Sequence, residues 1–263
     1  MSTRMKFLSI SGAVTALLLG MQLGGLVNLQ QIPNDIGLSE HIETRYVIVG
    51  LDITLGREDE LQKDFVAIQK LLKKINLGDN LEMFLIHSRS ESEQEAICSI
   101  EMPNKPGPMG LELSRAKKGA EQAFSNCWDE KVKPLIGSNK YVQRTDLFGF
   151  LRFVSQRAEF RKHENPILIL LTDGQQVGDG LNFEKVIPNE ADLTKVIDNN
   201  LLPNLSGIKV LIAGFTPTHN VSNAHWRKLQ AWWREYLKTA GAEVVSIASE
   251  RNLQQIMKKY NEQ

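Results

Sequence analysis

The sequence has little cysteine and no excess of charge of either sign. Only two of its 263 residues are cysteine, and 31 basic residues balance 31 acidic ones, so the formal net charge is zero. A neutral chain lacks the basic footprint of a nucleic-acid-binding protein, and its five histidines and two cysteines show no zinc-ligand spacing. We therefore expect neither a nucleic-acid partner nor a zinc centre.

Motifs of several enzyme classes are absent as well. No Gly-x-Gly-x-x-Gly or Gly-x4-Gly-Lys-Ser/Thr follows an expected strand, which argues against dinucleotide and P-loop nucleotide binding. The Gly-x-Ser-x-Gly elbow of serine hydrolases is missing too. The length and the 42% of apolar residues are typical of one large globular domain.

The head of the chain differs from the rest. No side chain from Phe7 to Val27 is charged, and a helix over this stretch would reach roughly 30 Å, the thickness of a bilayer core. Arg4 and Lys6 precede the run, which favours a cytoplasmic amino end and places the following domain outside the cytoplasm. The expected parts are a membrane anchor over residues 1–27, a linker over 28–44 and a globular domain over 45–263. The alternative is a cleaved signal peptide and a secreted domain.

Strand and helix signals alternate from Arg45 onward. Short apolar runs bounded by turn residues predict strands over residues 46–51, 81–86, 96–100, 167–171, 208–213 and 243–247. Apolar residues at spacings of three and four predict helices over 61–75, 113–127, 147–158, 193–202, 224–240 and 253–260. Residues 174–189 are expected to form a long loop. The alternation predicts a three-layer α/β/α sandwich with a mostly parallel, Rossmann-like sheet, in which residues 96–100 form an edge strand.

The two cysteines leave two readings open. Cys98 and Cys127 are compatible with one disulfide in an oxidising compartment, and equally with two buried thiols. Each lies among apolar residues of its expected element. On that ground we favour free cysteines in the core.

Oxygen-bearing side chains follow two of the expected strands. Asp52 and Thr54 come directly after the first strand, Asp173 comes after the fourth, and Thr145 opens the third helix. The carboxyl ends of parallel strands share one edge of a sheet, and ligands bind at that edge. Two carboxylates and two hydroxyls suit Mg²⁺ or Mn²⁺. We therefore predict a divalent metal site whose ligands are Asp52, Thr54, Thr145 and Asp173.

This pattern resembles the von Willebrand factor A-type (VWA) domain family. That family holds a divalent ion with Asp-x-Ser-x-Ser after the first strand, a threonine before a later helix, and an aspartate after the fourth core strand. Asp52 and Thr54 match the first two positions, Thr145 the distal threonine and Asp173 the distal aspartate. Gly56 departs from the pattern, because it replaces a serine that would bind the ion. The resemblance implies a VWA-like fold and protein binding without turnover, in which a carboxylate of the partner protein completes the metal site.

Two other functions stay open. Because Gly56 removes one ligand, the domain is alternatively a metal-free scaffold that kept the fold. Phosphatases of the haloacid dehalogenase type also place an aspartate after the first strand and bind Mg²⁺, but they need a second aspartate where this chain has Thr54. We expect a membrane-tethered, extracytoplasmic protein-binding module, not an enzyme.

Overall fold

The computed structural model describes most of the predicted globular domain. The described residues are 43–54, 57–92, 95–104, 111–136, 144–216 and 222–254. The chain divides into the units Met1–His41 and Ile42–Gln263, and every described residue belongs to the second. The predicted anchor and Gly56 lie outside the described residues. Within the described ranges, no helix has the length and apolar character needed to cross a membrane.

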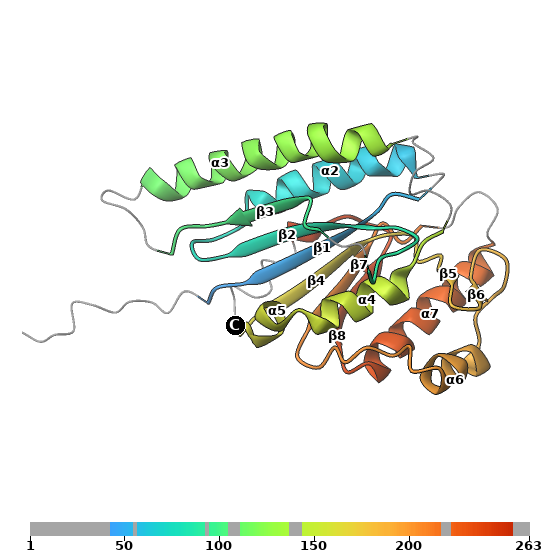
Figure 1. Cartoon of the computed structure of the whole chain (residues 1–263). Helices are drawn as coiled ribbons and strands as arrows, with labels where there is room; N and C mark the ends of the chain where they lie inside the picture. Colours follow the sequence, from blue (N-terminus) through green and yellow to red (C-terminus); the bar gives the residue numbers. More distant parts are fainter. Residues whose placement is uncertain are drawn as a thin grey trace, which may run out of the picture. The chain divides into compact units, whose positions relative to one another are not determined.

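A six-stranded sheet runs through the centre of this unit in the order β3-β2-β1-β4-β7-β8 (Figure 1). Its strands are β1 (Tyr46–Asp52), β2 (Asn80–Ile86), β3 (Cys98–Glu101), β4 (Pro166–Leu171), β7 (Lys209–Ala213) and β8 (Glu243–Ala248). Neighbouring strands are parallel except for the β2–β3 pair at one edge. Every residue of β1 and β4 is buried, which is why both strands have continuous apolar sequences. The predicted α/β class, mostly parallel sheet and edge strand are confirmed, and the structure shows that this edge strand is antiparallel.

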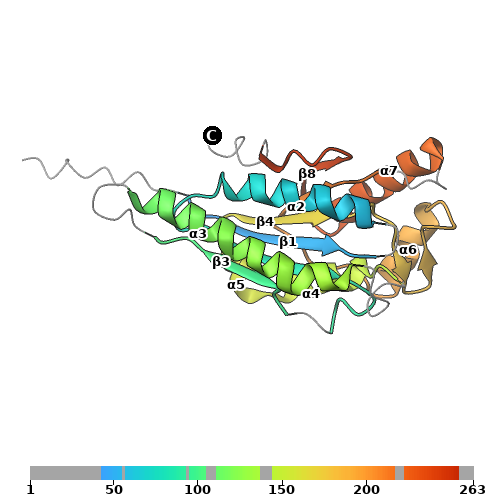
Figure 2. The same cartoon turned by 90° about the horizontal axis from the view of Figure 1, so that it is seen from above.

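Helices cover both faces of the sheet (Figures 1 and 2). One face carries α2 (Glu58–Leu72) and α3 (Leu111–Cys127), and the other carries α4 (Leu147–Gln156), α5 (Ala158–Lys162) and α7 (Asn223–Thr239). A further helix, α6 (Glu190–Asp198), precedes β7, and α3 continues into a π-helical turn (Trp128–Val132) and a 3₁₀ turn (Lys133–Leu135). Successive side chains of β1 point to opposite faces of the sheet. Ile48 and Val49 therefore belong to two separate apolar cores, one on each face.

One predicted helix and one predicted loop contain structure that the sequence did not indicate. The helix predicted over 147–158 is divided into α4 and α5, because Arg157 between them has an extended backbone. The loop predicted over 174–189 contains a small ribbon, formed by β5 (Val177–Gly178) and β6 (Leu181–Asn182). Asp179 and Gly180 at its turn both have positive φ, at 51° and 75°, as a tight two-residue hairpin turn requires. Most of the closing helix predicted over 253–260 lies outside the described residues.

The two cysteines form a disulfide, so the expectation of free cysteines was wrong. Cys98 opens β3 and Cys127 ends α3, and their Cα atoms lie 5.8 Å apart. Their apolar surroundings arise because α3 packs against this edge of the sheet, and such surroundings suit a disulfide as well as a buried thiol. The bond fastens the antiparallel edge strand to the helix that covers it.

Candidate functional site

The candidate site lies where β1 and β4 end. The two strands are parallel neighbours with Leu51 opposite Leu171, so Asp52 and Asp173 emerge at the same edge. The chain leaves β1 toward β2 on one side and leaves β4 toward β7 on the other. The strand order therefore reverses between them, and such a switch point is where open α/β sheets bind ligands. The ribbon β5–β6 lies at this end of the sheet (Figure 1).

Asp52 is fully buried and held by donors from two segments. Its Oδ1 accepts hydrogen bonds from the Thr54 amide at 3.1 Å and the Thr54 hydroxyl at 2.8 Å. Its Oδ2 accepts one from the Thr172 hydroxyl at 2.6 Å. The sequence predicted both side chains as ligands of one ion. In the structure Thr54 donates to Asp52, and its donating hydroxyl keeps its lone pairs for another partner.

Asp173 is nearly buried, with 8% of its surface exposed. One carboxylate oxygen accepts a hydrogen bond from the Gln175 amide at 3.0 Å, and the other accepts none from the described residues. Burial, followed by the negative charge of Asp52, raises the pKa of Asp173 to about 6. Gly174 follows at φ 78°, and a Cβ there would collide with the ring of Phe215. The turn that presents Asp173 therefore requires glycine.

Thr145 reaches this region through its backbone. Its carbonyl accepts a hydrogen bond from Val177 at 3.0 Å, and the side chain of Gln176 caps α4 by accepting from the Leu147 amide at 2.6 Å. The segment after Asp173 is thus bound to the start of α4. Thr145 as a residue is only 3% exposed, and its hydroxyl has no hydrogen-bond partner among the described residues. No described contact joins it to the side chains of Asp52, Thr54 or Asp173.

A buried arginine also belongs to this edge. Arg57, just before α2, has a side chain that is 3% exposed. Its guanidinium lies 3.4 Å from Asp52 Oδ2, and it donates to Asp64 at 2.9 Å and to the Leu171 carbonyl at 2.7 Å. Burial lowers the pKa of Arg57, but the surrounding carboxylates outweigh it and the pKa is raised overall. Arg57 is therefore a permanent cation inside the predicted metal site.

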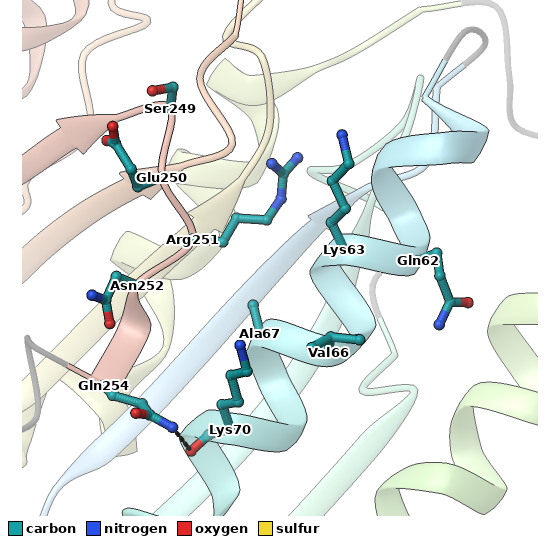
Figure 3. A pocket seen from close by; sticks show the side chains of 10 residues that line it. All are labelled: Gln62, Lys63, Val66, Ala67, Lys70, Ser249, Glu250, Arg251, Asn252 and Gln254. Atoms are coloured by element: carbon teal, nitrogen blue, oxygen red, sulfur yellow. Dashed lines mark hydrogen bonds between the residues drawn. The ribbon is translucent and has the colours of Figure 1, made fainter.

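Arg251 extends this charge network to the surface. It follows β8 and lines a groove between α2 and residues 249–254, where Figure 3 shows it beside Lys63 of α2. Its guanidinium donates to Asp64 and to Glu60, both on α2. Burial raises the pKa of Asp64, against the lowering effect of both arginines. Two arginines thus form ion pairs with three carboxylates, those of Asp52, Asp64 and Glu60.

Several oxygen atoms at this edge are free to bind a hard cation. The hydroxyls of Thr54 and Thr145 and one oxygen of Asp173 are not used as acceptors by the described residues, whereas both oxygens of Asp52 are engaged. Asp52 would therefore act through its charge and through the orientation of Thr54. Oxygen ligands with room for waters are what Mg²⁺ prefers. Within the described residues, no group of three or more histidine, cysteine or acidic side chains is arranged to hold a metal ion.

Sequence reasoning missed three side chains of this site, namely Arg57, Thr172 and Gln176. An arginine or glutamine in a loop is usually exposed, so neither residue type gives a signal of its own. Thr172 had one available signal, because it sits between a buried strand and Asp173. Successive side chains along a strand point in opposite directions, so the side chain of Thr172 points away from that of Asp173 and back into the protein.

Comparison with known proteins shows distant likeness to solved structures only. No family model and no curated protein matches the sequence. Proximal thread matrix protein 1 from the mussel byssus is 13% identical, with a TM-score of 0.41 over 82% of this chain and 44% of that one. The PilB minor pilin from Streptococcus sanguinis is 13% identical, with a TM-score of 0.45 over 84% and 61%. A von Willebrand factor type A structure from Catenulispora acidiphila is 13% identical, with a TM-score of 0.38 over 83% and 42%. The chain spans less than two thirds of each structure's length.

Proposed function

We propose that this chain is a membrane-tethered, extracytoplasmic protein-binding module with a VWA-like fold, and that its partner docks at the edge formed by Asp52, Thr54, Thr145 and Asp173. In this proposal the site takes Mg²⁺ or Mn²⁺. The observation that supports it is an excess of buried negative charge, since the three buried carboxylates of Asp52, Asp64 and Asp173 meet only two arginines among the described residues, Arg57 and Arg251. A divalent cation would offset that excess.

The ion would supply a directional positive charge for a carboxylate of the partner protein. Thr54, Thr145 and Asp173 would hold it, and Asp52 would keep the Thr54 hydroxyl in place. Thr54 is also an argument against the phosphatase alternative. It stands where that chemistry needs a second aspartate, and its hydroxyl is committed to Asp52.

Calorimetry of the full-length chain in detergent, titrated with Mg²⁺ and with Mn²⁺, tests the metal site. Wild type should bind, and Asp173→Ala should lose the binding heat. Asp179→Asn is the control, because Asp179 is a partly exposed carboxylate of the nearby ribbon that pairs with Arg152 at 3.5 Å, and asparagine tolerates its positive φ. Heat that survives in Asp173→Ala would exclude this site. Hydrolysis of a generic phosphate ester that is lost in Asp52→Asn would favour the enzyme.

The metal-free scaffold remains the second candidate, and Arg57 favours it. A guanidinium near Asp52 supplies part of the positive charge that an ion would bring. Absence of binding heat for both metals in wild type would favour this candidate. Protein binding would then depend on the same edge without an ion.

The disulfide and the uncharged segment from Phe7 to Val27 support the proposed location. Disulfides persist in oxidising compartments outside the cytoplasm, and the segment is long enough to span a bilayer. An alkaline wash of membranes should leave the full-length chain in the pellet. A shortened chain in the soluble fraction would instead favour the secreted alternative.

A further inference from the structure

Arg57 occupies a position in which a loop arginine is rarely found. Besides the Asp64 and Asp52 carboxylates, its guanidinium donates to the main-chain carbonyls of Asp52 at 3.2 Å and Leu171 at 2.7 Å. These carbonyls end β1 and β4. The planar fork of a guanidinium can serve several acceptors at once. Arg57 therefore joins the carboxyl ends of two neighbouring strands to helix α2.

We infer that Arg57 is a built-in counter-ion of Asp52, which keeps the oxygen-donor edge assembled without a metal ion and weakens the binding of a divalent cation there. The inference rests on the proposed function, because it concerns the same site. It goes further by naming the residue that sets the affinity of the site for its ion.

The charges explain the weakening. With Asp52 and Asp173 ionised, the edge carries two negative charges, and Arg57 reduces the net charge to one. Arg57 is itself buried, so water screens its repulsion of a second cation poorly. Arg57 also cannot leave easily, because Asp64 and two main-chain carbonyls hold its guanidinium.

The hydrogen bonds explain the assembly without an ion. Asp52 is fixed by Thr54 from the loop after β1, by Thr172 from the end of β4 and by Arg57 from the start of α2. Each of these contacts forms between groups of the chain itself. Removal of an ion would leave all of them in place.

Substitution of Arg57 separates this role from a merely structural one. The full-length chain in detergent is titrated with Mn²⁺ by calorimetry, and its melting temperature is recorded in EDTA and in Mn²⁺. Arg57→Gln should bind Mn²⁺ roughly tenfold more tightly than wild type or better, since a buried positive charge is removed. Its melting temperature should fall in EDTA and recover in part when Mn²⁺ is added.

Arg251→Gln is the matched control. It removes the other arginine of Asp64 but has no described contact with Asp52. It should lower the melting temperature, keep the wild-type affinity for Mn²⁺ and show no recovery with the ion. If Arg57→Gln matches Arg251→Gln in all three respects, the inference is overturned.

The same titration tells failure of the inference from failure of the proposed function. Wild type that binds Mn²⁺ with the affinity of Arg57→Gln overturns the inference alone. Wild type without binding, beside an Arg57→Gln variant that binds, supports the inference and contradicts a metal site in the native chain. Absence of binding in both proteins overturns both.

A second variant guards against misfolding of Arg57→Gln. The double substitution Arg57→Gln with Asp64→Asn removes both members of a buried ion pair, which is less disruptive than removing one. Arg251 retains Glu60 as its partner in this variant. The double variant should show the same gain in Mn²⁺ affinity over Asp64→Asn alone, and an unchanged affinity would overturn the inference.

Discussion

Two buried groups of charges lie at opposite ends of β1, and they differ in how their charges balance. At the amino end, Asp79 accepts hydrogen bonds from Arg45 Nε, Arg45 Nη2 and the Arg45 amide, and one from the Asn76 amide at 2.7 Å. There, the buried guanidinium of Arg45 is paired directly with the buried carboxylate of Asp79. At the carboxyl end, Arg57 pairs with Asp52 and Asp64, Arg251 also pairs with Asp64, and Asp173 adds a third carboxylate. The balanced end serves the architecture, whereas the end with surplus negative charge is the one suited to a ligand.

The largest expected effect comes from breaking the balanced end. Asp79→Asn leaves the buried charge of Arg45 without this carboxylate, which should lower the free energy of unfolding by about 3–5 kcal/mol. Urea denaturation in EDTA measures it. Asp129→Asn is the control, because its pair with Lys133 is exposed on both sides and should contribute less than about 1 kcal/mol. Equal losses of unfolding free energy in the two variants would contradict a structural role for the Arg45–Asp79 pair.

The carboxyl end should respond to pH in a direction set by its surplus charge. The pKa of Asp173 is raised from 3.8 to about 6 in the folded chain, so between these values the folded state binds more protons than the unfolded state. Stability should therefore fall as pH rises through this window, by on the order of 3 kcal/mol, and Asp173→Asn should lack that fall. The difference in unfolding free energy between wild type and variant, measured in EDTA from pH 4 to 7, isolates the effect. A difference that does not change with pH would contradict the raised pKa.

The smallest expected effect concerns a single hydrogen bond to Asp52 at the carboxyl end. Thr172→Val removes the hydroxyl that donates to the charged Asp52 at 2.6 Å, which should cost about 2 kcal/mol. Ser90→Ala removes a buried hydroxyl that donates to the neutral His87 carbonyl at 2.7 Å, which should cost about 1 kcal/mol. Both are measured by urea denaturation. A larger loss in Ser90→Ala would argue against the importance of the Asp52 charge.

The sequence was sufficient to predict the layers of this fold and the shared edge of Asp52 and Asp173. Apolar runs without alternation mark β1 and β4 as central strands, and strands buried on both faces are parallel neighbours in α/β sheets. Residues at or just past their carboxyl ends, such as Asp52 and Asp173, must then emerge at the same edge of the sheet. This reasoning uses only local periodicity, which is why it succeeded.

The sequence was insufficient where a long-range contact decides the outcome. Burial of Arg57 depends on Asp64, seven positions away, and on the Leu171 carbonyl, which is distant in sequence. The pairing of Cys98 with Cys127 depends on how α3 lies along the edge strand. Neither contact leaves a periodic trace. The first turn of α6 was missed for another reason, since it begins with the polar capping residues Asn189 and Asp192, ahead of any apolar stripe.

One hydrogen bond gives the protein an internal optical reporter. The indole of Trp233 on α7 is fully buried and donates to the Gly174 carbonyl at 2.8 Å, one residue beyond Asp173. The emission of an indole depends on the dipoles around it, so movement of this turn would change the fluorescence of the unlabelled chain. Events at the rim of the sheet can thus be followed in real time without the addition of a dye.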